Sequence, residues 1–113
     1  MRISLIILFL FISLSAQARL HGQARLDSLL KELDSKKSEK KDTNYVDLLY
    51  TISLEISQSN PDMSIKYGLE SLKLAEGLHN KYHIAWAHNS LASGYRFKGD
   101  FATSLQHFFL TLT

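Results

Sequence analysis

The sequence predicts an all-α fold built from antiparallel helix pairs. Three observations indicate it. Apolar residues recur at helical spacing, capping and turn-forming residues separate the segments, and one helix pair matches the next at a shift of about 40 residues. A content of 45% hydrophobic and 21% charged residues is typical of a folded chain. The lack of cysteine excludes a disulfide framework, a thiolate metal site and a lipidated N-terminal cysteine.

Charge and length limit the possible functions further. Arg2 is the single basic residue among the first 18, so residues 19–113 carry a formal charge of +1. This near-neutral charge does not indicate the basic surface that binding to a nucleic-acid duplex needs. The remaining 95 residues make one small domain at most, and such a domain is only marginally stable alone.

Residues 1–18 predict a secretory signal peptide. Met1 and Arg2 give a positive start, 12 mostly apolar residues follow at 3–14, and the Ser-Ala-Gln-Ala of 15–18 places small residues at the two positions of a cleavage site. We expect export to the periplasm, with cleavage after Ala18. The alternative is an uncleaved membrane anchor, but 12 helical residues span about 18 Å of a hydrocarbon core roughly 30 Å thick.

Residues 19–42 predict an amphipathic helix and a charged linker. The helix has a leucine stripe at Leu26, Leu29, Leu30 and Leu33. The lysine-rich run at 36–41 is interpreted as a solvated helix end, because neighbouring acidic residues offset its charge. Contact with an anionic surface is the alternative.

Residues 43–80 predict the first helix pair. Asp42, Thr43 or Asn44 caps its first helix, whose buried positions include Val46, Leu49, Ile52 and Ile56. The Asn-Pro-Asp of 60–62 ends that helix and begins the next, with Asn60 or Asp62 as the cap. The buried positions of the second helix are Ile65, Leu69, Leu72, Leu74 and Ala75, and Gly77 and Asn80 close it.

Residues 81–113 predict the second pair. Its first helix turns Ile84, Ala87, Leu91, Ala92 and Tyr95 inward. After a Lys-Gly-Asp turn at 98–100, its second helix runs from Phe101 and buries Leu105 and Phe108. The chain ends inside this helix with Phe109 and Leu112 uncovered, so we expect either a piece of a longer protein or a partner on this face.

The two pairs are repeats of each other. Ile52-Ser53 corresponds to Leu91-Ala92, and Ser64-Ile65 corresponds to Ser104-Leu105. The second pair resembles a tetratricopeptide repeat, with the pattern W-x2-L-G-x2-Y, then A-x3-F, then P. The residues that carry this resemblance are Leu91, Ala92, Tyr95, Gly99, Phe101, Ser104, Leu105 and Phe108. Small residues at Ala92 and Ser104 would let the helices approach, while Tyr95 and Phe108 would fill the space around the crossing.

The resemblance departs from the pattern in several places. His88 or Leu49 stands at the Trp position, no Pro closes either unit, and the period exceeds the usual 34 residues, so the resemblance is to a long-repeat type of α-solenoid. Exported repeat regions of this kind resemble the extracytoplasmic parts of bacterial signalling proteins. Those precede a transmembrane helix and a histidine kinase, nucleotide cyclase or DNA-binding output domain, and none of these follows within the sequence.

In this family the first helix of each pair lines the concave face. The positions expected there are Trp86, Asn89, Ser93 and Arg96 in the second pair, and Asp47, Tyr50, Leu54 and Ser57 in the first. Trp supplies contact area, Asn can bond a peptide main chain, and Arg can bind a carboxylate. The alternative is that Trp86 packs under the loop after His79 and Arg96 only solvates the helix end.

The histidines are the best candidates for a catalytic or metal-binding site, but their positions do not indicate one. His79 and His83 have a spacing that can hold zinc, but Gly77 and Asn80 place His79 in a turn and no third ligand follows. We interpret His88 as a hydrogen-bonded structural residue, and His21 and His107 as surface residues. We expect no catalytic site, metal or cofactor. We expect the partner to be a protein or a peptide. The predicted function is an exported interaction module of a signalling protein, or a stand-alone periplasmic scaffold.

Overall fold

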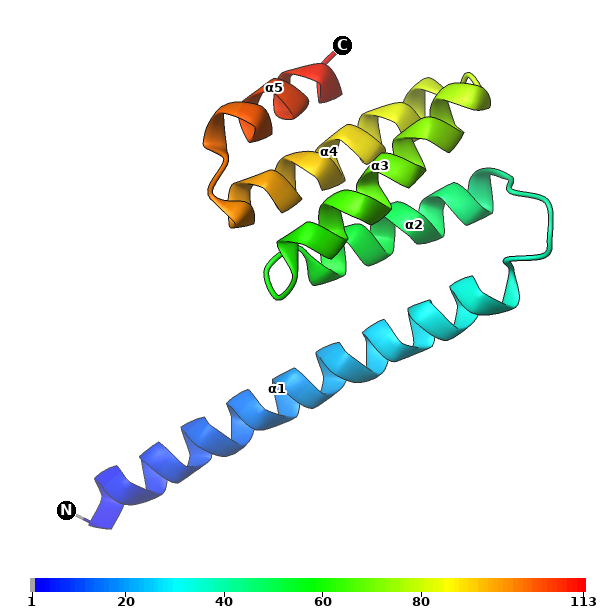
Figure 1. Cartoon of the computed structure of the whole chain (residues 1–113). Helices are drawn as coiled ribbons and strands as arrows, with labels where there is room; N and C mark the ends of the chain where they lie inside the picture. Colours follow the sequence, from blue (N-terminus) through cyan, green and yellow to red (C-terminus); the bar gives the residue numbers. More distant parts are fainter. Residues whose placement is uncertain (1) are drawn as a thin grey trace.

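In the computed structural model, which describes residues 2–113, the chain is all-helical, as predicted. The helices are α1 (Arg2–Ser35), α2 (Thr43–Ile56), α3 (Pro61–Gly77), α4 (Lys81–Lys98) and α5 (Phe101–Thr111), and the described residues contain no strand. The last four pack in sequence as one body, from which α1 extends to the N-terminus (Figure 1).

Asx residues begin each helix of the packed body. In each case a side-chain oxygen accepts a hydrogen bond from the backbone N–H three residues later, at 3.1–3.2 Å, and the caps are Asp42, Asn60, Asn80 and Asp100. Asp42 and Asn60 are among the predicted caps, whereas Asn80, predicted to close one helix, caps the next. Gly99 ends α4 in the left-handed region, with a φ of 93°.

The leader and the amphipathic helix, predicted as separate segments, form one continuous helix, α1. Gly22 is the only poor helix former near the expected boundary, and one glycine costs about 1 kcal/mol, which is too little to break a long helix. All of α1 before Leu26 is exposed. By length and composition this helix could cross a membrane, a test that a signal sequence also passes.

The predicted leucine stripe attaches α1 to the packed body. Leu33 is buried against α2, and three partly buried leucines of the stripe pack beside it: Leu26, Leu29 and Leu30. An ion pair between Arg25 and Glu55, 3.1 Å apart, lies at the same contact. The amphipathic part of α1 therefore covers one side of α2, while its apolar first half contacts none of the other helices.

Small residues lie where the helices of the body cross. Ser53 and Ser64 are fully buried between α2 and α3, and Ser104 bonds α5 to Ala92 on α4. At the crossing of α3 and α4, a Cβ added at Gly94 would lie 3.0 Å from the side chain of Ile65. These contacts are too close for larger side chains, so the register of each crossing is set by its small residues.

Three residues that the sequence places in the core are exposed. Leu105 is 55% and Phe108 is 52% exposed, because α5 packs against α4 alone among the described helices. The half-buried residues of α5 are polar ones: Thr103, Ser104, His107 and Thr111. Leu69 on α3 is 49% exposed. The apolar stripe of α5 therefore faces solvent here, and its polar stripe faces α4.

Candidate functional site

A small cleft of about 180 Å³ is lined by residues of α2, α4 and α5. Four of the eight positions expected on the concave face line it, namely Leu54, Asn89, Ser93 and Arg96. Ala92, Ser104 and Phe108 complete the lining. The predicted rows on α2 and α4 thus meet at one cleft. α5 adds a wall that includes Phe108, which the sequence predicts to lie in the core.

Some polar side chains of the cleft already make hydrogen bonds within the protein, and others do not. Ser93 Oγ donates to Ser57 Oγ at 3.1 Å, and Ser104 Oγ donates to the carbonyl oxygen of Ala92 at 2.6 Å. The amide of Asn89 makes no hydrogen bond to any described residue. The Arg96 guanidinium lies 4.7 Å from the ring centre of Phe97 and forms no ion pair within residues 2–113. Asn89 and Arg96 are therefore the groups free to bind a ligand.

Trp86 lies at the far end of the same row on α4. Its ring stacks on that of Tyr50 with centroids 5.8 Å apart and planes 13° apart, and it meets the edge of Tyr82 at 6.3 Å. Trp86 keeps 38% of its surface exposed. It also lines a second hollow of about 200 Å³, which it shares with Asn89. Trp86 therefore joins the two predicted rows across the helix crossing and does not pack only beneath the loop after His79.

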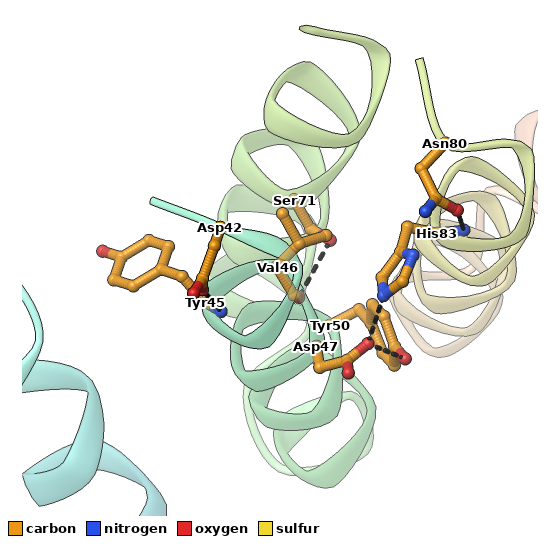
Figure 2. Close-up of polar contacts among 8 residues, drawn as sticks. All are labelled: Asp42, Tyr45, Val46, Asp47, Tyr50, Ser71, Asn80 and His83. Atoms are coloured by element: carbon orange, nitrogen blue, oxygen red, sulfur yellow. Dashed lines mark hydrogen bonds and ion pairs between the residues drawn. The ribbon is translucent and has the colours of Figure 1, made fainter. Parts of the chain in front are cut away.

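Asp47 on α2 links Tyr50, a member of this aromatic cluster, to His83 on α4 (Figure 2). Its Oδ1 lies 2.8 Å from Nε2 of His83 and also accepts a hydrogen bond from the Tyr50 hydroxyl. Burial, and then the hydrogen bond and charge of Asp47, raise the pKa of Tyr50. Tyr50 therefore stays protonated and cannot act as a base near neutral pH.

His83 is a site residue that the sequence reasoning considered only as a metal ligand. It is buried, and with Nε2 directed at Asp47 its Nδ1 has no hydrogen-bond partner among the described residues. Its position three residues before Trp86, on neighbouring positions of one helix face, is the sequence signal that could have identified it. Its contact with Asp47 ties α4 to α2, and its ring lies 5.2 Å from that of Tyr82 and 6.2 Å from that of Tyr50.

The other histidines fall into two groups. His79 lies in the turn between α3 and α4, as predicted, with a φ of 52°, and its side chain is exposed. The prediction that His88 is a hydrogen-bonded structural residue is confirmed, since it is buried and its Nδ1 lies 3.0 Å from Nδ1 of His107. The prediction that His107 is a surface residue is wrong, because its ring is held between His88 and Tyr95. The described residues hold no cluster of three or more His, Cys, Asp or Glu that could bind a metal.

Comparison of the chain with protein-family models, with curated proteins and with solved structures finds no match. The resemblance to tetratricopeptide repeats therefore stays a prediction.

Proposed function

We propose that this chain is an exported helix-repeat module that binds an extended peptide or protein segment along the face formed by α2 and α4. The observation that carries the proposal is the convergence of Leu54, Asn89, Ser93 and Arg96 on one cleft, beside a partly exposed tryptophan.

The size of the hollows favours a peptide over a small-molecule ligand. The two hollows measure about 180 and 200 Å³, below the roughly 300–1,000 Å³ typical of small-molecule sites. Asn89 lines both of them. Neighbouring small hollows along one helix suit successive side chains of an extended segment.

The chemistry of the face suggests how such a segment would be held. Trp86 offers apolar area, the unbonded amide of Asn89 can pair with a peptide main chain, and Arg96 can bind an acidic side chain. Ser93 is hydrogen-bonded to Ser57, and Ala92 is buried. Ser93 and Ala92 therefore shape the cleft more than they contact a ligand.

The repeat architecture is the second part of the proposal. Ser64 Oγ donates to the carbonyl oxygen of Ser53, and Ser104 Oγ donates to that of Ala92, its counterpart in the second pair. Equivalent contacts at equivalent positions support the long-repeat, tetratricopeptide-like interpretation. With an exported leader, such a module suits the sensory part of a bacterial signalling protein. A stand-alone periplasmic scaffold is the alternative.

Peptide selection followed by substitution tests the binding proposal. Peptides would be selected from a random library on the full chain in detergent micelles, and their affinities measured by fluorescence anisotropy. Asn89→Ala and Arg96→Ala should each weaken binding about fivefold or more, which corresponds to a loss of about 1 kcal/mol or more per side chain. Lys73→Ala, at an exposed position on α3, should bind like the parent. Selected peptides that bind all three variants equally well would show that the ligand site lies elsewhere.

A further inference from the structure

His88 on α4 and His107 on α5 contact each other, and neither lines the cleft or the second hollow. Their Nδ1 atoms are 3.0 Å apart while the ring centroids are 5.3 Å apart, so the two nitrogens face each other. Tyr95 stacks on His107 with centroids 5.5 Å apart and planes 8° apart, which fixes the orientation of that ring. Two helices are therefore joined through a pair of titratable groups.

This contact depends on how many protons the pair carries. When both imidazoles are neutral, one Nδ1–H donates and the other Nδ1 accepts. When one ring is protonated, its Nδ1–H still donates to the neutral partner. When both are protonated, both nitrogens are donors and two positive charges lie side by side, so the contact becomes repulsive. The bond survives only while at least one ring is neutral.

The surroundings of the pair favour its neutral form. Burial lowers the pKa of His88, against the opposing effect of Glu76 on α3. Burial, and then the charge of His88, lower the pKa of His107. Tyr95 on α4 stacks on His107. Asp47, the acidic residue of α2 that contacts α4, is engaged by His83 and Tyr50. Glu76 is thus the one carboxylate acting on the pair within residues 2–113.

The pair also controls one wall of the cleft. α5 packs on α4 alone among the described helices, and its half-buried contacts to α4 include His107 and Ser104. Ser104 and Phe108, which flank His107 on α5, line the cleft together with Asn89 and Ser93 of α4. A movement of α5 at His107 would therefore move the wall that Phe108 supplies.

We propose that His88 and His107 form an acid-sensitive clasp, which holds α5 on α4 near neutral pH and releases it when both rings are protonated. Release opens the cleft on its α5 side. The consequence for ligand binding rests on the proposed function, but the release of α5 does not.

Hydrogen exchange without any peptide tests the clasp. The full chain in detergent micelles would be compared at about pH 7 and about pH 5, with rates corrected for intrinsic exchange. The protection of the amides of 105–111 should fall about fivefold or more at the lower pH relative to α2, the effect of losing one hydrogen bond. H107Q should abolish this pH dependence, because glutamine bonds His88 without becoming charged. H79Q, in an exposed turn, should respond like the parent.

Two results would overturn the clasp. One is equal protection of α5 at both pH values in the parent chain, and the other is a pH-dependent loss that persists in H107Q. If H107Q loses its helical circular dichroism, an imidazole NMR titration of the parent decides. Two independent histidines with ordinary pKa values would overturn the proposal, and coupled, lowered ones would support it. Because no peptide is present, these outcomes are separate from the fate of the binding proposal.

Discussion

Ser53 and Ser64 exchange hydrogen bonds across the α2–α3 crossing, each Oγ donating to the other residue's carbonyl oxygen at 2.7 Å. Both serines are fully buried. In the second pair only half of this arrangement remains, since Ala92 replaces Ser53 and Ser104 alone donates. The first crossing is therefore bonded in both directions and the second in one.

Ser64→Ala should lower the free energy of unfolding by about 1–3 kcal/mol, because it removes the buried hydroxyl that donates to the carbonyl oxygen of Ser53 and lies 3.2 Å from Ser53 Oγ. Ser59→Ala, at an exposed position, should change it by less than about 0.5 kcal/mol. Urea unfolding followed by circular dichroism measures both. Equal midpoints for the two variants would mean that the reciprocal contact contributes nothing.

Gly94→Ala should destabilise the chain, whereas Gly77→Ala should not. A Cβ at position 94 would lie 3.0 Å from Ile65 Cγ1 and 3.0 Å from Ser64 Oγ, while a Cβ at position 77 would meet nothing within 4 Å. We expect a loss of about 1–3 kcal/mol for the first from overpacking. For the second we expect a gain of up to about 1 kcal/mol from helix propensity. Thermal melts of the pair that shift in the same direction would contradict this packing of α3 on α4.

Much of the helical architecture could be predicted from the sequence, because caps and turns are local signals. Asp42, Asn60 and Gly99 act within one turn of their own positions, so no tertiary information is needed to find them. The rows on α2 and α4 were predictable for a similar reason, since helical periodicity fixes which residues share a face.

Burial is predicted wrongly from the sequence where the orientation of a helix depends on its neighbours. The apolar stripe of α5 predicts that Leu105 and Phe108 are buried, but the face packed on α4 carries Ser104 and His107 instead. Periodicity identifies a stripe without saying which stripe meets the neighbour. The contact between His88 and His107, 19 residues apart, follows only from that orientation.

The stability of the chain should decline as the pH falls below about 6.5, the ordinary imidazole value. Burial lowers the pKa of His88 and His107 in the folded state, so the unfolded chain binds more protons in this range and is favoured by acid. The contribution is fully present above the unfolded value. Urea midpoints at about pH 7 and about pH 5 should therefore differ less in H107Q than in the parent. A larger difference between the two urea midpoints in H107Q than in the parent would contradict the lowered pKa values of His88 and His107.

The leader should be removed on export, which leaves Arg19 at the N-terminus of the periplasmic protein. Small residues at Ala16 and Ala18 fit the cleavage site, so Ala18→Asp should block processing and leave the chain attached to the membrane through α1. N-terminal sequencing of fractionated cells provides the measurement. Met1 intact on membrane-bound parent protein would identify α1 as an anchor, and Met1 intact on cytoplasmic protein would exclude export.

The central claim is that the face of α2 and α4 binds an extended segment. The most direct measurement is a map of amide chemical-shift changes in the full chain when a library-selected peptide is added. We predict that the largest changes cluster around Leu54, Trp86, Asn89, Ser93 and Arg96, with smaller ones at the start of α5. Changes centred on the exposed face of α3, at Lys66 and Lys73, or no localised changes at saturating peptide, would contradict the claim.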